Sequence, residues 1–269
     1  REITDHTTPQ DILKKYGTNR FVKPSRLDPV KVKQTEVEML KAAGGLGFSS
    51  VLLSPAGLLG SCSVTAAVDQ GNVISAGRGT ELLADGTNML ALYLADGIKR
   101  KSIDNTKDPV HLAAACRVIR AQKTEGDTLV PHFSLISLVS SGRDTGSYGF
   151  EKGAMEKHLN YYIRYFEALG YRPEISLNRR GGYTDTAGFI NRMYDYLCSV
   201  YPDSKCIISG EEADNRYYQG LNFKVHVNGV SIVDGGFVDW TQRLLGNRKE
   251  RFLISGAGID LQYITGLLE

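Results

Sequence analysis

The sequence predicts an α+β protein with a mostly antiparallel sheet flanked by helices. Extended segments follow one another directly, at 111–122 and 132–142 and again in the last third, instead of alternating one for one with helices. Asn228-Gly229 lies between two runs of alternating apolar residues, which is a strong hairpin signal. The sequence lacks the glycine-rich phosphate-binding and dinucleotide-binding motifs of many parallel α/β proteins.

The composition is that of an ordinary globular protein. Of 269 residues, 42% are hydrophobic and 23% are charged, enough for a sizeable core in one large domain or two small ones. The formal net charge of +2 does not require a nucleic-acid partner. No apolar run reaches the length of a membrane span, and the first residues lack the apolar segment of a signal peptide. We therefore expect a cytoplasmic protein with no membrane association.

The cysteines and histidines show no spacing typical of a metal site. None of the four cysteines forms a C-x-x-C pair, and none of the five histidines belongs to an H-E-x-x-H motif. Scattered thiols of this kind are typical of reduced cytosolic proteins, so we expect no zinc site. The cysteines are Cys62, Cys116, Cys198 and Cys206.

The first third predicts a polar arm, a helix, a strand and a loop. Residues 1–28 are polar and contain two prolines, and residues 29–44 carry an apolar stripe that ends at Gly44-Gly45. The string FSSVLLSP then predicts a short strand closed by Pro55. Residues 56–70 are rich in Gly, Ser and Ala, and we expect a mobile loop there.

The string ELLADGTNM, residues 81–89, raises a question about Asp85. It precedes Gly86 and Thr87 at the start of a helix that we expect to run to about Lys101. Asp before Gly-Thr is ordinary chemistry for a helix N-cap. A carboxylate at a helix start also serves well as a substrate ligand, so the local sequence leaves both roles open.

Two strands and two further helices follow. HLAAACRVIRAQ and HFSLISLVSSG predict adjacent strands, with Arg120 inside the first of them. Apolar residues at helical spacing predict helices over 151–170, with Gly170 as its stop, and over 186–200, on either side of the strand YRPEISLN. The stripe of the first helix should be core rather than a cofactor site: Met155, Leu159, Tyr162, Phe166 and Leu169.

The last third predicts the hairpin, one more strand and a short helix. Phe223, Val225 and Val227 alternate before the turn, and Val230 and Ile232 alternate after it. Asp234 and Asp239 flank Gly235-Gly236, where we interpret them as turn formers. ERFLISGAGIDLQYITGLL, residues 250–268, then predicts a glycine-containing strand that opens into a helix.

Several strings, taken in order, resemble one known family. LLADGT is similar to L-R-P-E-G-T, VIRAQ to a strand with F-R-x-E, YYQGLNF to Y-Y-T-G-x-x-F, GGFVD to G-G-R-Y-D, and SGAGIDLQ to G-x-G-x-E-R-L. The matched patterns are those of the class II aminoacyl-tRNA synthetase core, specifically histidyl-tRNA synthetase. Its catalytically silent paralogue, the regulatory subunit of ATP phosphoribosyltransferase, is more similar still. The resemblance spans about residues 30–269.

The resemblance implies roles for particular residues. Asp85 takes the position of the family carboxylate that holds the amino group of a substrate, with Thr87 close beside it. Arg120 takes the position of the arginine that binds the ATP α-phosphate. Gln122 occupies the position of the glutamate in the same string. Tyr217, Tyr218 and Gly220 have two possible roles: either one tyrosine lines a small-molecule pocket and Gly220 makes room for it, or the tyrosines are core aromatics beside a close backbone approach. Residues 30–55 would form a homodimer interface. Cofactors implied in this way are ATP or an amino acid.

Departures from the family pattern argue against histidine activation. Adenylate formation requires fixed cations and metal-holding carboxylates around the phosphates. Apolar residues occupy four contact positions of the family, and Gln122 replaces the motif glutamate. Each lost charged contact removes binding worth several kcal/mol, as an order of magnitude. The four apolar positions are Leu135, Val139, Phe237 and Leu261.

The resemblance also sets the domain organisation. Residues 1–29 form an N-terminal arm, and residues 30–269 form a synthetase-like core domain whose insertion is shortened to about 179–215. No anticodon-binding domain follows Glu269, and the net charge is near neutral, so we do not expect tRNA to bind.

Three functions remain open at this level. The first is a non-catalytic regulatory subunit that belongs to histidine biosynthesis, binds a small amine and assembles with a catalytic ATP phosphoribosyltransferase chain. The second is a ligase or transferase that activates another amino or carboxylic acid with ATP, with Arg120 on the phosphate and Asp85 on the amine. The third is a dimeric scaffold with an empty pocket, because the fold alone does not determine function.

Overall fold

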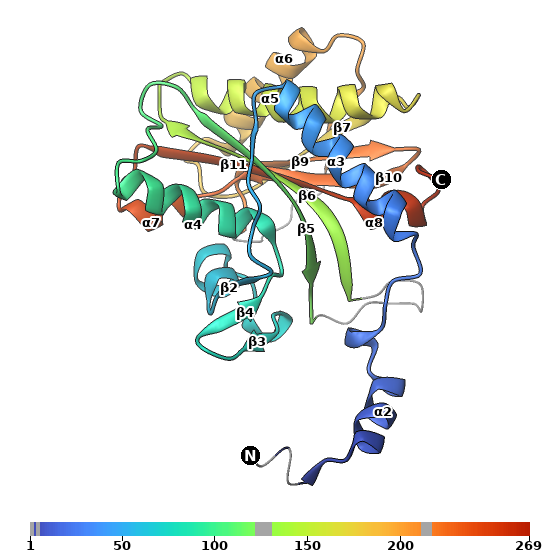
Figure 1. Ribbon diagram of the computed structural model, residues 1–269. Helices are drawn as coiled ribbons and strands as arrows, with labels where there is room; N and C mark the ends of the chain where they lie inside the picture. Colours follow the sequence, from blue (N-terminus) through green and yellow to red (C-terminus); the bar gives the residue numbers. More distant parts are fainter. Residues whose placement is uncertain (1–2, 4–5, 122–130, 211–216) are drawn as a thin grey trace.

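The computed structural model describes residues 3, 6–121, 131–210 and 217–269. Within that part of the chain, an eight-stranded sheet with the order β1-β5-β6-β11-β10-β9-β7-β8 forms the centre of the molecule (Figure 1). The β1–β5 and β7–β8 pairs are parallel, and the neighbours between them are antiparallel. The predicted α+β class is confirmed, although the sheet is mixed rather than purely antiparallel.

The elements have the following bounds. The helices are α2 (Pro9–Thr18), α3 (Pro29–Gly45), α4 (Gly86–Lys99), α5 (Gly149–Ala168), α6 (Thr186–Val200), α7 (Trp240–Leu245) and α8 (Ile259–Ile264). The strands of the large sheet are β1 (Ser49–Ser50), β5 (Val110–Ile119), β6 (His132–Arg143), β7 (Glu174–Arg179), β8 (Cys206–Ile208), β9 (Gln219–Val227), β10 (Val230–Phe237) and β11 (Glu250–Gly258). A small sheet contains β2 (Ala56–Leu58), β3 (Ser75–Ala76) and β4 (Thr80–Leu82). None of the described helices is long and apolar enough to cross a membrane.

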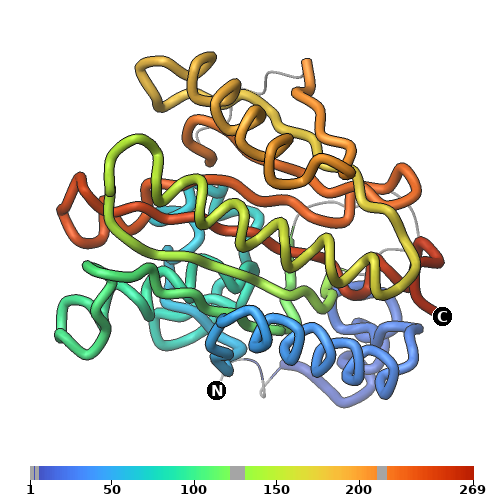
Figure 2. Tube along the Cα trace, turned by 90° about the horizontal axis from the view of Figure 1, so that it is seen from above, coloured from blue at the N-terminus to red at the C-terminus, as the bar shows by residue number. Residues whose placement is uncertain are grey.

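Helices cover both faces of the large sheet. On one face α3, α5 and α6 lie side by side over the strands (Figures 1 and 2). The predicted α5 stripe is buried there, except that Leu169 lies beyond the helix and is 37% exposed. On the other face α4 and α7 pack over a second core cluster that includes Trp240 and Phe252. The two faces are therefore separate cores, and the second one borders the candidate site.

Residues 56–70 do not form the mobile loop that the composition predicted. They begin with β2 and continue into a π-helical turn over Ser61–Thr65. The buried carboxylate of Glu81 fixes this turn, because it accepts hydrogen bonds from Gly60 N (2.9 Å), Ser61 Oγ (2.7 Å) and Cys62 N (3.0 Å). These bonds hold the pKa of Glu81 at about 2, against the opposing effect of its burial. The strand expected over FSSVLLSP is also shorter than predicted, since β1 has two residues.

The hairpin is confirmed in detail. Asn228 and Gly229 have φ values of 50° and 79°, and Val230 pairs with Val227 across the turn. Asp234 is not a turn former, because it lies inside β10, opposite Lys224 of β9. That interpretation was wrong because the glycines after Asp234 are strand residues on which Phe223 and Tyr218 pack closely.

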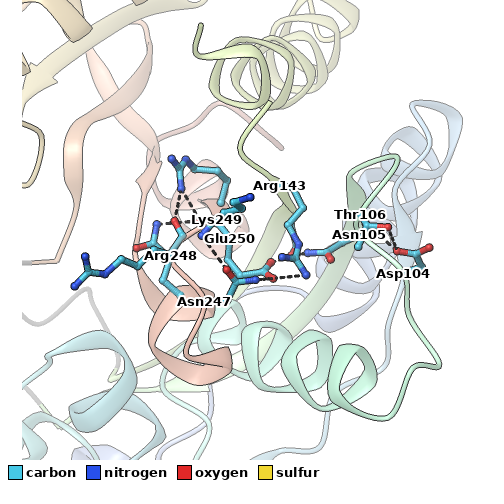
Figure 3. A network of polar contacts seen from close by, with 11 residues as sticks. Asp104, Asn105, Thr106, Arg143, Asn247, Arg248, Lys249 and Glu250 are labelled. Carbon is cyan, nitrogen blue, oxygen red and sulfur yellow. Dashed lines mark hydrogen bonds and ion pairs between the residues drawn. The ribbon is translucent and has the colours of Figure 1, made fainter. Parts of the chain in front are cut away.

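A buried polar network holds the far end of the sheet together (Figure 3). Glu250 at the start of β11 is fully buried, forms an ion pair with Arg143 of β6 (3.0 Å) and accepts a hydrogen bond from Asn105 (2.8 Å). In Figure 3 the side chains of Arg143 and Asn105 point toward this carboxylate from two different segments. The network thereby attaches the connection between α4 and β5 to the sheet.

Candidate functional site

A cavity of about 1010 Å³ lies beside the start of α4. Strands β6, β10 and β11 contribute residues to its wall, as do the small-sheet region, the start of α4 and α8. The N-terminal arm contributes residues from Arg20 to Leu27. The size suits a small-molecule ligand, and its wall combines apolar side chains with a few charged ones.

Five of the seven predicted ligand residues line this cavity. They come from three separate parts of the chain: Asp85, Thr87, Arg120, Tyr217 and Tyr218. Gly220 does not line it. It has a φ of +72°, and a Cβ there would lie 2.7 Å from Phe189 and Tyr183, so its role is in close packing. Gln122 lies outside the described residues.

Asp85 combines the two roles that the sequence left open. It is the N-cap of α4, and its Oδ1 accepts hydrogen bonds from the backbone N (2.8 Å) and Oγ1 (2.9 Å) of Thr87. Its Oδ2 accepts a hydrogen bond from the hydroxyl of Tyr217 at 3.3 Å. The carboxylate therefore caps the helix while it borders the cavity.

A second carboxylate–tyrosine pair lies in the same wall. The Tyr218 hydroxyl donates to Oδ2 of Asp234 at 2.6 Å, and Asn222 donates to Oδ1 at 2.9 Å. The surface of Asp234 is open to the cavity, but protein around the carboxylate limits its hydration and raises its pKa. The sequence missed this residue because its Asp-Gly-Gly context is typical of a turn.

The two tyrosines are neutral hydrogen-bond donors. Their rings meet edge to face at 4.8 Å, and Tyr217 also packs edge to face on Trp240 at 5.5 Å. Burial and the adjacent carboxylates raise the pKa of both phenols well above the usual value. Both hydroxyls therefore stay protonated and orient Asp85 and Asp234.

Arg120 follows β5 instead of lying inside the strand as predicted. The strand ends at Ile119, and the backbone N of Arg120 donates to the carbonyl of Pro131 at 2.9 Å. The guanidinium lies 5.2 Å from the centre of the Phe133 ring, and Nε donates to the carbonyl of Ala84 at 3.0 Å. These contacts place a fixed cation in the cavity wall next to Asp85.

The positions that depart from the family pattern divide into two groups. Leu135 and Leu261 line the cavity, where they form apolar wall. Val139 and Phe237 are buried in the core away from it, at 0% and 3% exposure. Two of the four substitutions therefore change the surface that a ligand would contact.

The thiols nearest to Asp85 are poor nucleophiles. Cys62 accepts a hydrogen bond from Asn88 Nδ2 at 2.8 Å and lines the cavity. Burial raises the pKa of both Cys62 and Cys116 to about 12. Among the described residues, no three His, Cys, Asp or Glu side chains are grouped so that they could hold a metal ion.

Comparison with known proteins gives structural relatives only. No family model and no curated sequence matches the chain. The structure is similar to an ATP phosphoribosyltransferase regulatory subunit/histidyl-tRNA synthetase from Bacillus halodurans C, with a TM-score of 0.69, 14% identity, and coverage of 93% of this chain and 83% of that chain. It is also similar to histidyl-tRNA synthetase from Nostoc sp. PCC 7120, with a TM-score of 0.66, 16% identity, and coverage of 93% and 76%.

A third similar structure is a histidine–tRNA ligase subunit from Alicyclobacillus acidocaldarius, with a TM-score of 0.63, 11% identity, and coverage of 90% and 94%. Together these comparisons establish that the fold is like that of histidyl-tRNA synthetase, and they confirm the resemblance found in the sequence strings. At these identities they concern the fold alone, so the function depends on the residues of the cavity.

Proposed function

We propose that this chain is a non-catalytic histidyl-tRNA synthetase paralogue that binds a small amine and regulates a partner enzyme. Its role would be similar to that of the ATP phosphoribosyltransferase regulatory subunit, in histidine biosynthesis. The observation that carries the proposal is the composition of the cavity wall. It has carboxylates oriented by tyrosines, and leucine at two positions where the family has polar or charged contacts.

The carboxylates favour an amine as the ligand. Asp85 and Asp234 each accept a hydrogen bond from one tyrosine hydroxyl, and both border the cavity. An ammonium group offers donors only, which matches carboxylate oxygens. The raised pKa of Asp234 fits this role, because a cation beside the carboxylate would favour its charged form.

The leucines argue against catalysis of adenylate formation. Leu261 occupies the position of the family arginine that lies against ATP, and it lines the cavity. An apolar side chain there gives no stabilisation to the charge that develops on the phosphates in the transition state. Leu135 likewise gives no hydrogen bond to a histidine side chain, so we expect the amine to be a different one.

Regulation requires an assembly that the ligand can shift. We propose a homodimer through residues 30–55, where Val30, Val37 and Leu52 are exposed large apolar side chains. A ligand changes the contact with a catalytic ATP phosphoribosyltransferase chain only if it binds one assembly state more tightly than another. The partner chain in this proposal is of that catalytic type.

One observation favours a second function, an ATP-dependent ligase or transferase. Arg120 still lies in the cavity wall over the Phe133 ring, as a phosphate-binding arginine would. ATP–pyrophosphate exchange across a panel of amino acids and small carboxylic acids tests this alternative. Turnover with any of them would replace the regulatory proposal, and silence throughout would leave the amine-binding function.

The regulatory function is tested by a thermal-shift screen of amines, amino acids and ATP. A ligand at a hundred times its Kd adds about 2.7 kcal/mol of stability. We expect a primary amine to raise Tm, and the same amine to change co-purification with a catalytic ATP phosphoribosyltransferase chain. If no amine changes Tm and no complex with the catalytic chain forms, the regulatory proposal is wrong and the scaffold function is left.

A further inference from the structure

The N-terminal arm lies along one end of the cavity and is fixed there. Residues Lys23 to Leu27, which connect α2 to α3, line the cavity. Nε2 of His132 forms a hydrogen bond of 2.6 Å with the carbonyl of Lys23. A carbonyl oxygen only accepts, so Nε2 carries the proton of this imidazole. Its Nδ1 then accepts from Nε (3.1 Å) and Nη2 (2.7 Å) of Arg117. The arm is thereby attached to the first residue of β6.

This end of the cavity is rich in positive charge. Three cationic residues of the arm line it: Arg20, Lys23 and Arg26. The nearby carboxylate of Asp260 is already paired, because it accepts from the backbone N of Ser134 at 3.0 Å and contacts Arg117 at 3.4 Å. The contacts of this carboxylate therefore go to residues of the sheet and not to Lys23 or Arg26 of the arm.

Strand β6 gives the distance between this end and the carboxylate end. His132 holds the arm, and Ser137 lies against Gly86, where a Cβ would be 2.7 Å from the serine Oγ. Five residues of strand separate the two positions, which corresponds to about 17 Å. Asp85 immediately precedes Gly86, so the arm cations and Asp85 lie toward opposite ends of the cavity.

The wall between the two ends is largely apolar. Phe133 and Leu135 of β6 and Leu261 and Ile264 of α8 contribute apolar side chains to the wall. A charged group in the middle of a ligand would lose hydration beside these apolar side chains. The cavity therefore has an acidic end, an apolar middle and a basic end.

We infer that the arm forms an anion-binding subsite, so that the ligand carries an amine at one end and a carboxylate or phosphate at the other. The amine half of this statement rests on the proposed function, whereas the anion subsite stands on the arm geometry alone. Leu261 occupies the position of the arginine in the family string G-x-G-x-E-R-L, and the arm brings cations to the same cavity from another part of the chain. Guanidinium and ammonium groups bind carboxylates and phosphates through charge-assisted hydrogen bonds.

The test is isothermal titration calorimetry of the full chain with inorganic pyrophosphate and with adipate. Pyrophosphate tests for binding of a phosphate group and adipate for binding of a carboxylate group. The diamine 1,6-diaminohexane serves as a probe that carries amines but no anionic group. We expect one of the two anions to bind, and to bind about tenfold more weakly to the double variant Lys23→Ala/Arg26→Ala. The matched control is Lys14→Ala/Lys15→Ala, which removes two exposed cations of α2 that do not line the cavity.

The outcomes separate the anion subsite from the amine function. Loss of anion binding in the cavity double variant but not in the α2 control supports the subsite. Absence of anion binding in the unmodified chain, or equal losses in both double variants, would overturn it. Asp85→Asn serves as the third variant, because it should weaken 1,6-diaminohexane binding while anion binding stays within about twofold. Urea unfolding of each variant verifies that it is folded, and Arg26→Gln alone replaces the cavity double variant if that variant is not.

Discussion

Replacement of Asp85 separates its two roles. In Asp85→Ala, α4 loses its N-cap, which costs about 1 kcal/mol. The part-buried hydroxyl of Tyr217 also loses its acceptor at 3.3 Å, and a donor left without a partner costs about 1–3 kcal/mol. We therefore expect a free energy of unfolding lower by about 2–4 kcal/mol.

Asp85→Asn is the matched variant. The amide oxygen of asparagine still caps α4, and the amide still offers a hydrogen-bonding group near Tyr217. We expect its stability to lie within about 0.5 kcal/mol of the unmodified chain. The negative charge is lost, so the affinity for an amine found in the thermal-shift screen should fall about 10- to 100-fold.

Equilibrium unfolding in urea, followed by circular dichroism, measures both stabilities at pH 7. An alanine variant as stable as the unmodified chain would refute the reasoning, because it would mean that neither the cap nor the Tyr217 bond contributes. An asparagine variant as weak as the alanine variant would show that charge, rather than the oxygen acceptor, holds this helix start. Unchanged amine affinity in Asp85→Asn would limit the residue to its capping role.

Three further predictions follow from buried groups. Burial lowers the pKa of His111 to about 4 and that of His158 well below 6.5, so their stabilising contribution is complete above pH 6.5 and decreases as the pH falls toward 4. Urea unfolding from pH 7 to 4.5 should show a shallower decrease for His111→Gln, whereas the exposed control His6→Gln should match the unmodified chain. Glu81→Ala leaves the donors of the 60–62 turn unpaired, so Cys62 should react faster with a thiol reagent and stability should fall by about 3 kcal/mol; an unchanged labelling rate would contradict the role of Glu81. Gly220→Ala combines a φ of +72° with contacts at 2.7 Å and should cost about 2–4 kcal/mol, whereas Gly229→Ala, with φ +79° and open space, should cost about 1–2 kcal/mol; equal losses would exclude the steric contribution.

Local patterns predicted the elements well because their causes lie within a few residues. The stripe over 155–166 is a helix face because residues three and four apart share a side, and it is buried in α5 as expected. Asn228-Gly229 produced its hairpin because both residues adopt a positive φ. The cap at Asp85 also depends only on the two residues that follow it.

Predictions failed where a residue depended on a distant neighbour. Residues 56–70 were expected to be a loop, since no short-range pattern shows that the carboxylate of Glu81 organises them. Leu169 fits the helical spacing of α5, but the helix ends at Ala168, so the side chain is outside the packed interface. Gly220 was assigned to a pocket, whereas Phe189 and Tyr183 from another layer occupy the space beside it.

The sequence alone determined the order of the long helices α3 to α6, the β5–β6 pair, the hairpin and the cap at Asp85, because propensity and periodicity act over short distances. It did not predict α2 within the polar arm, the small sheet, β8 or α7. Its strings also indicated the synthetase-like fold and five of the residues around the cavity. Only the tertiary structure placed Asp234 beside Tyr218 and brought the arm cations to the end of the cavity opposite Asp85. Those positions depend on strand pairing and on contacts such as His132 with Lys23, 109 residues apart in the chain, which no local pattern records.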